Sequence, residues 1–163
     1  MAKSKKTSQP GKPFKNSDID YGVLKQSLGY LIRRAQIKIF QEFAHFFEAL
    51  DVKPAQFSAL EVIHNNPGLR QTALAEALGI QRTNMVGMLD KLQQRGLIER
   101  QPSAKDLRAH ELYLTGKGEK LLDHLHRQFF EHETLLRQRL GEDNYQLVRE
   151  NLKIIVRADD LDD

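Results

Sequence analysis

The sequence lacks cysteine altogether, which excludes disulfide bonds, thiolate metal sites and thiol-based redox sensing within the chain. It also lacks any run of about 18 apolar residues, so we expect no membrane-spanning helix and no membrane partner. The opening stretch, MAKSKKTSQPGKPFKNS, contains no apolar segment of the kind found in secretory signals. Together these absences predict a cytoplasmic protein.

Patterns that carry catalysis or bind metals are equally scarce. The chain has no glycine-rich phosphate-binding motif, and neither Ser58 nor Ser103 has the partners of a catalytic nucleophile. Its six histidines are scattered, without the i, i+4 spacing that a helical metal site needs. We therefore expect no enzymatic activity, no cofactor and no metal site.

Positive charge is concentrated in parts of the chain. Of the 25 basic residues, five lysines lie in residues 1–17, which leaves 20 basic against 22 acidic residues in the rest. From Arg70 to Arg108, however, seven basic residues accompany four acidic ones. A locally positive stretch inside a neutral-to-acidic body favours contact of that stretch with nucleic acid.

The two ends of the sequence are polar and contain little to bury. Residues 1–17 predict a disordered basic tail, which either contacts DNA phosphates or is simply solvated. Residues 158–163 predict an acidic tail. We therefore expect the folded part of the chain to lie between these two segments.

Residues 18–50 have the apolar spacing of one long helix. A helix of about 30 residues spans about 45 Å, more than a small domain needs, and its apolar side chains fall on more than one face. We therefore assign residues 18–53 to a dimerisation region. Three cations, Arg33, Arg34 and Lys38, interrupt the apolar stripes. They are either surface cations or the wall of an anion-accepting pocket.

Residues 54–115 have the layout of a winged helix-turn-helix. Pro54 suits the first turn of a helix, and Gly79 supplies the positive φ of a tight stop between two further short helices. Gly96 ends the second of these helices, and two alternating segments then follow as the strands of a hairpin. This order of elements predicts a DNA-binding head.

The second helix of the motif carries polar and small side chains on its outward face, near its N-terminus. They are Arg82, Thr83, Asn84, Val86 and Gly87. An arginine suits guanine, an asparagine suits adenine, and a methyl group can contact thymine in the major groove. Glycine costs a helix about 1 kcal/mol relative to alanine, which is tolerable where the backbone must approach a partner closely. These residues are predicted to contact DNA bases.

The predicted hairpin has a charged loop long enough to protrude. Asp106 and Arg108 are two residues apart, so in an extended segment they share one face and the carboxylate can orient the guanidinium. An arginine at a hairpin tip suits a narrow minor groove, whose negative potential attracts it. Lys105, Asp106 and Arg108 are therefore predicted DNA contacts. The plainer interpretation is an ordinary charged loop.

Thr115 is placed to cap a helix that Gly141 ends, and a last amphipathic helix follows. Residues 116–157 thus form a second helical region, whose apolar faces are too wide to be buried on so small a head. Together with residues 18–53, this region predicts a homodimer formed by the two ends of the chain. The expected fold is mainly α with a small β-hairpin.

The hairpin sequence resembles that of the MarR family of winged-helix transcriptional regulators. The pattern D-x-R-x-x-x-L-x-L-T runs from Asp106 to Thr115, and the segment from Leu92 to Arg100 is also similar. The resemblance implies a two-fold dimer joined by its terminal helices, with the second motif helix of each subunit in a major groove of a palindromic operator. It also implies that Arg108 is the arginine of the wing, with Asp106 as its supporting acid.

A second likeness concerns the effector. Members of the family usually release DNA when a small ligand binds between the dimer arms and the heads. The segment Leu28–Ala35 is similar to the opening of members that control aromatic-acid catabolism, some of which respond to hydroxycinnamoyl-CoA thioesters. The phosphates of such a thioester would account for the cations of the first helix. The implied ligand-binding residues are Arg33, Arg34, Lys38, Phe40 and Phe57.

We therefore expect a ligand-responsive transcriptional repressor that binds double-stranded DNA as a homodimer. Its expected effector is a small aromatic compound, either an aromatic acid or a hydroxycinnamoyl-CoA thioester. The alternative is a winged-helix protein that binds DNA without sequence preference, or binds a protein partner, and has no small-molecule switch.

Overall fold

The computed structural model of the chain describes residues 19–103 and 110–156. The chain divides into two compact units, residues 1–38 and 39–163, and helix α1 (Leu28–Phe46) runs across their boundary. Both predicted tails lie outside the described residues. The predicted division of the chain by role, into dimerisation regions and a DNA-binding head, stays a prediction.

The prediction of one continuous helix over residues 18–50 is wrong. A 3-10 helix, η2 (Gly22–Gln26), comes first, and Ser27 takes an extended conformation before α1 begins. The Ser27 hydroxyl accepts a hydrogen bond from the Tyr30 N–H at 3.2 Å, which caps the start of α1. Serine favours such a local cap over a helix interior, whereas the apolar spacing simply continues across the break.

The chain also changes form after α1. A second 3-10 helix, η3 (Glu48–Leu50), follows, and Asp51 adopts a left-handed conformation with φ of 49°. Helix α2 (Pro54–Asn65) then begins at its proline. The predicted break before residue 54, and the role of Pro54 as the first helical residue, are confirmed.

The helix-turn-helix consists of α3 (Gln71–Ala77) and α4 (Arg82–Gln94). Gly79, between them, has a φ of 60°, and Gly96, after α4, has a φ of 67°. Both values are in the left-handed region that favours glycine, as the sequence predicted. The side chains that α4 buries are Met85, Leu89 and Leu92.

Three short strands form an antiparallel sheet in the order β1-β3-β2. The strands are β1 (Leu69–Arg70), β2 (Ile98–Pro102) and β3 (His110–Leu114). Strand β2 extends to Pro102, which pairs with His110. Strand β3 is thus central, and the hairpin that it forms with β2 is the wing of the fold.

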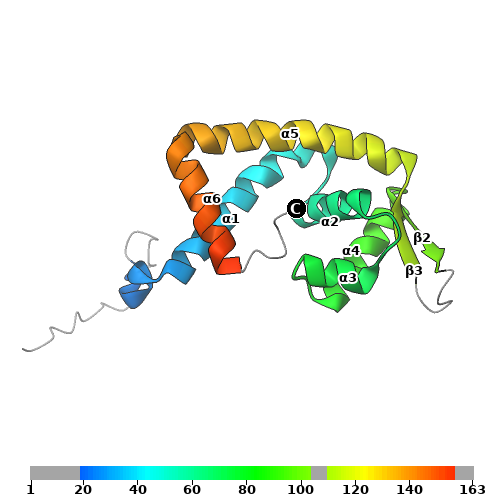
Figure 1. Ribbon diagram of the computed structural model, residues 1–163, viewed down its shortest axis with the longest axis horizontal. Helices are drawn as coiled ribbons and strands as arrows, with labels where there is room; N and C mark the ends of the chain where they lie inside the picture. The colour runs from blue at the N-terminus through cyan, green and yellow to red at the C-terminus, as the bar shows by residue number, and fades with distance from the viewer. Residues whose placement is uncertain (1–18, 104–109, 157–163) are drawn as a thin grey trace, which may run out of the picture. The chain divides into compact units, whose positions relative to one another are not determined.

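Two helices, α5 (Gly116–Leu140) and α6 (Glu142–Val156), follow the hairpin (Figure 1). The Thr115 side chain accepts a hydrogen bond from the Gly118 N–H at 3.1 Å, which confirms Thr115 as the cap of α5. In Figure 1, α5 lies along α2, and the two helices are in contact. No helix in the described ranges is long and apolar enough to cross a membrane.

The core of the second unit joins α2, the helix-turn-helix, the sheet and α5. Burying a leucine or phenylalanine side chain stabilises a fold by about 1.5–3 kcal/mol. Side chains that are completely inaccessible there include Phe47, Leu60, Ile63, Leu74, Met85, Leu89, Leu92, Leu112 and Leu125. This shared core fixes α4 and the hairpin relative to α2 and α5.

Candidate DNA-binding surface and ligand pocket

The N-terminal half of α4 presents all five predicted base-reading residues to solvent. Arg82, Thr83, Asn84 and Gly87 are exposed, and Val86 is 42% exposed. A Cβ added at Gly87 would meet nothing within 4 Å among the described residues. Packing within the chain therefore does not require glycine at this position. The small residue leaves the outer surface of the helix open to a partner.

Arg82 lies next to an acid in this structure. Its guanidinium is 3.4 Å from the Glu76 carboxylate, and both side chains are largely exposed. An exposed pair of this kind contributes about 0–1 kcal/mol, because water screens it. The guanidinium can therefore exchange Glu76 for another partner at little cost.

Arg100, one of the basic residues in the locally positive stretch, binds within the chain. Its guanidinium is 2.7 Å from the Asp90 carboxylate and donates to the Gln93 side-chain oxygen at 2.6 Å. Arg100 belongs to β2, whereas both of its partners belong to α4. Its charge therefore fixes the hairpin to the helix, a role that charge counting alone did not reveal.

Arg95, just after α4, has a similar internal role. Its guanidinium donates to the carbonyl oxygens of Asp51 and Leu50, at 2.5 and 3.2 Å. Its own carbonyl accepts a hydrogen bond from Lys117 at 2.7 Å. These contacts join the end of α4 to the η3–α2 connection and to the start of α5. Their partners are more than 20 residues away in the sequence, so no local pattern could have indicated them.

The predicted wing contacts, Lys105, Asp106 and Arg108, lie outside the described residues. The strands on either side of them pair in register, from Ile98 opposite Leu114 to the turn end of the hairpin. The structure thus confirms the hairpin itself. The DNA contacts of its loop stay a prediction.

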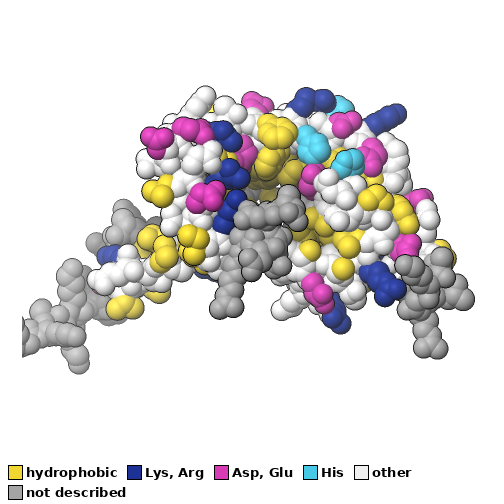
Figure 2. Space-filling model, viewed as in Figure 1, with side chains coloured by type: hydrophobic (Ala, Val, Ile, Leu, Met, Phe, Trp, Pro, Cys, Tyr) yellow, Lys and Arg dark blue, Asp and Glu magenta, His cyan; other side chains and the backbone are white. Residues whose placement is uncertain are grey.

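A pocket of about 290 Å³ lies between α2 and α5. Its wall is largely aromatic: Phe57 faces Phe129 with ring centroids 5.5 Å apart, and Phe130 lies 5.3 Å from Phe129. Figure 2 shows hydrophobic and histidine side chains side by side on the face that carries these helices. The volume is at the lower end of the range of small-molecule sites, about 300–1,000 Å³, and suits one aromatic ring with a short substituent.

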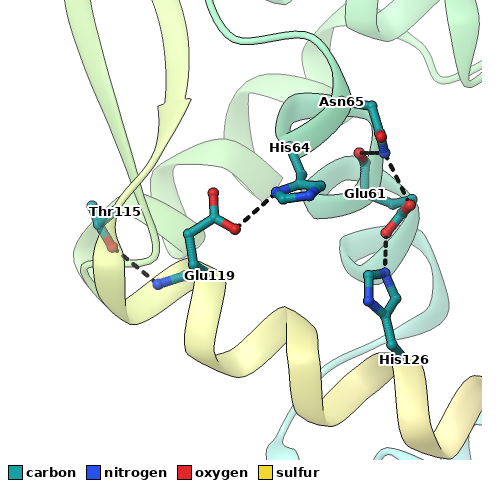
Figure 3. Close-up of polar contacts among 7 residues, drawn as sticks. Glu61, His64, Asn65, Thr115, Glu119 and His126 are labelled. Carbon is teal, nitrogen blue, oxygen red and sulfur yellow. Dashed lines mark hydrogen bonds and ion pairs between the residues drawn. The ribbon is translucent and has the colours of Figure 1, made fainter.

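Two histidine–carboxylate pairs connect the same two helices (Figure 3). The Glu61 carboxylate of α2 is 2.5 Å from His126 Nε2 of α5. The His64 imidazole of α2 is 2.8 Å from the Glu119 carboxylate of α5. Glu61 and His126 also line the pocket, with Ser58 and Val62. Sequence reasoning missed both pairs, because the partners are 55 and 65 residues apart.

The five residues predicted to bind the ligand are found in different environments. Phe57 is buried and lines the pocket, whereas Phe40 is 48% exposed and is not part of its lining. Arg33, Arg34 and Lys38 belong to the unit of residues 1–38 and are exposed there. Their role in ligand binding stays a prediction.

His132, on α5, is buried. It is 1% exposed, its ring packs edge-on against Phe43 at 4.7 Å, and neither ring nitrogen makes a hydrogen bond. Burial lowers the pKa of His132, and Arg139 lowers it further, whereas Glu133 and Glu42 oppose the shift. His132 is therefore a neutral side chain near neutral pH. In the described ranges, no group of three or more histidines and acids could hold a metal ion.

Comparison with known proteins shows which family has this arrangement. A sequence model of the MarR family matches residues 50–109. A candidate transcriptional regulatory protein for the hcr operon of Thauera aromatica is 39% identical over 116 residues, which are 69% of each chain. The chain belongs to the MarR family. The family assignment from the sequence, the mainly α fold with a small sheet, and the winged helix-turn-helix are all confirmed.

Solved structures include close matches to this MarR-family chain. The transcriptional repressor CouR bound to a 23-mer DNA duplex is 40% identical, with a TM-score of 0.80, and the match covers 85% of this chain and 98% of CouR. CouR bound to p-coumaroyl-CoA is 39% identical with the same TM-score and coverage. MepR of S. aureus in a DNA complex is 27% identical, with a TM-score of 0.73, over 81% of this chain and 98% of MepR. The chain is thus a MarR-family transcriptional regulator.

Proposed function

We propose that this MarR-family regulator is a ligand-responsive repressor that binds a palindromic operator as a homodimer and is released by a small aromatic ligand. The observation that carries the proposal is the exposed N-terminal half of α4. Its polar side chains have no packing role in the chain and match the chemistry of base edges.

DNA recognition is assigned to α4 and to the wing. Arg82, Thr83, Asn84, Val86 and Gly87 would contact bases in the major groove, whereas Lys105, Asp106 and Arg108 would contact the backbone and the minor groove. The DNA complex of CouR, whose chain this one matches over nearly its full length, supports this assignment. Glu76 would give up Arg82 to the DNA when the complex forms.

Dimerisation is assigned to the ends of the chain. Helix α6 leaves most of its apolar side chains exposed, among them Ile154 at 75% and Leu147 at 61%. Residues 19–31 likewise expose apolar side chains, such as Val23 at 82%. Apolar side chains in this number, clustered at the ends of the chain, mark an interaction surface. A second copy would cover them and place two heads on a two-fold axis.

Ligand binding is assigned to the aromatic pocket between α2 and α5. Phe57, Phe129 and Phe130 suit a flat aromatic ring, and CouR has been solved with p-coumaroyl-CoA. Arg33, Arg34 and Lys38 remain predicted contacts for the phosphates of such a thioester, on the ground of their charge. Helix α2 contacts α5 as well as α3 and β3, so a ligand between α2 and α5 would act on the DNA-binding head.

The proposal is tested by footprinting on the DNA upstream of the gene, followed by titration with p-coumaroyl-CoA. We expect one protected palindrome with half-sites about one helical turn apart, and loss of protection as the thioester is added. Binding that is uniform along the DNA, and that depends only on salt, would instead favour the alternative of a winged-helix protein without sequence preference. A protected palindrome that p-coumaroyl-CoA leaves unchanged would remove the thioester from the proposal.

A further inference from the structure

The polar side chains that line the pocket already make hydrogen bonds within the chain. The Ser58 hydroxyl donates to the Pro54 carbonyl at 3.2 Å. The Glu61 carboxylate receives two donors, the Asn65 side-chain amide at 2.9 Å and His126 Nε2 at 2.5 Å (Figure 3). The carboxylate oxygens of Glu61 can only accept hydrogen bonds, and each can accept more than one. The polar part of the pocket therefore offers hydrogen-bond acceptors.

Because the pocket offers hydrogen-bond acceptors, it restricts which chemical groups a ligand can place against Glu61 and His126. A carboxylate placed against Glu61 would meet a like charge. A bare ring would take water away from the acceptors without replacing the hydrogen bonds that water makes to them. A hydroxyl group on the ring supplies the missing donor and adds no charge. The rest of the pocket is aromatic, so the hydroxyl must be carried by a flat apolar group.

We propose that Glu61 and His126 are specificity-determining residues that select an aromatic ring bearing a hydroxyl group, which donates its hydrogen bond to this pair. The inference rests on the proposed function, since it names what the ligand pocket recognises. It also orients the proposed ligand: the phenolic end of the molecule enters between α2 and α5, and its carboxyl-derived end stays outside.

The expected preference is moderate because the pair is partly open to water. The side chains of His126 and Glu61 are 32% and 37% exposed, so water satisfies part of their hydrogen bonding when the ligand has no hydroxyl. A hydrogen bond to a charged group that is partly solvated corresponds to a preference of about 10-fold. A fully buried site would discriminate far more strongly.

The test is calorimetric titration of the full-length protein with three thioesters: p-coumaroyl-CoA, cinnamoyl-CoA and 4-methoxycinnamoyl-CoA. They differ only in the group at the para position, which is a donor, a hydrogen atom and a capped oxygen, respectively. We expect p-coumaroyl-CoA to bind about 10-fold more tightly than either of the others. Because these titrations use the unaltered chain, they do not depend on the folding of any variant.

Two variants test whether Glu61 and His126 cause the preference for p-coumaroyl-CoA. In Glu61→Gln and in His126→Phe, we expect affinity for p-coumaroyl-CoA to fall about 10-fold while affinity for cinnamoyl-CoA is retained, which also reports that the variant is folded. The matched control is His64→Gln, which breaks the other histidine–carboxylate pair between α2 and α5 but does not line the pocket. It should keep the full preference.

The outcomes separate the inference from the function on which it rests. Equal binding of all three thioesters by the unaltered protein would overturn the inference and leave the proposed function in place. A preference that survives in both pocket variants would overturn the assignment to Glu61 and His126. If none of the three thioesters binds, the proposed ligand class fails, and the inference fails with it.

Discussion

Helices α4 and α6 are both amphipathic, yet they differ in how far their apolar side chains are buried. In α4, Met85, Leu89 and Leu92 are completely buried, and Val86 is the one large apolar side chain that the described helix exposes. In α6, Ile154 and Leu147 stay largely exposed. The DNA-binding head buries its apolar side chains within one chain, whereas most apolar side chains of α6 stay uncovered. This difference is what the proposed function assigns to DNA binding by α4 and to dimerisation by α6.

The largest effect is expected from substitutions on the exposed apolar face of α6. The double variant Leu152→Asp with Ile155→Asp places two charges on the exposed apolar face and should convert the dimer to a monomer, as measured by sedimentation. Operator affinity should fall about 100-fold or more, because two linked heads bind far more tightly than one. The control Asn151→Asp adds a charge to the same helix without removing apolar surface. A variant that still sediments as a dimer would contradict the assignment of this face.

A second prediction concerns the packing that supports the head. A Cβ added at Gly118 would lie 2.1 Å from the backbone carbonyl oxygen of Leu97, which cannot move aside as a flexible side chain could. Gly118→Ala should therefore lower the free energy of unfolding by about 2–3 kcal/mol, as measured by urea denaturation. Gly116→Ala, in the same first turn and with open space around it, should have little effect. Equal stabilities of the two variants would show that the chain adjusts here at no cost.

The third prediction acts on the outward face of α4. Arg82→Ala should cost about 1–3 kcal/mol of operator affinity and relax the base preference at one position, if Arg82 reads guanine. Fluorescence anisotropy on the operator and on single-base variants of it measures both effects. An equal loss on every sequence would make Arg82 a phosphate contact instead. Arg127→Ala, an exposed arginine of α5, serves as the control for lost charge.

The smallest effect is expected at His132. Its ring nitrogens are buried without hydrogen bonds, so His132→Leu should raise stability at neutral pH by about 1 kcal/mol. Because burial lowers the pKa of His132, the unfolded chain takes up the proton first as the pH falls below about 6.5, and the folded state loses stability there. The leucine variant should lack this loss in urea titrations at pH 7.5 and 5.0. His124→Leu, which replaces an exposed histidine of the same helix, should keep it; parallel pH profiles for all three proteins would contradict the prediction.

Much of the head could be predicted from the sequence because its determinants are local. Pro54, Gly79, Gly96 and Thr115 each act through their own backbone or through a neighbouring turn, and the structure confirms all four. The winged helix-turn-helix therefore followed from residues close together in the chain.

The features that were missed depend on contacts between distant segments. Nothing near Arg95 indicates that its guanidinium binds carbonyl groups 44 and 45 residues earlier, and the same holds for the pair of Glu61 with His126. One weak signal existed for His126: it lies four residues after Leu122 and three before Phe129, at the edge of the apolar stripe of α5. The break at Ser27 was missed for the opposite reason, since a local cap interrupted a spacing that continued on both sides.

The contacts of Arg95 and Arg100 limit how the head can move. Arg95 holds the end of α4 to the carbonyls of Leu50 and Asp51, and Arg100 holds the middle of α4 to β2. Both sets of contacts join α4 to neighbouring elements of the same head. In a transition between DNA-bound and DNA-free forms, we therefore expect α4, the hairpin and the η3–α2 connection to move together, like a lever. The distance between the two recognition helices of a dimer would be set by the angle of that lever, and the fold of the head would stay the same.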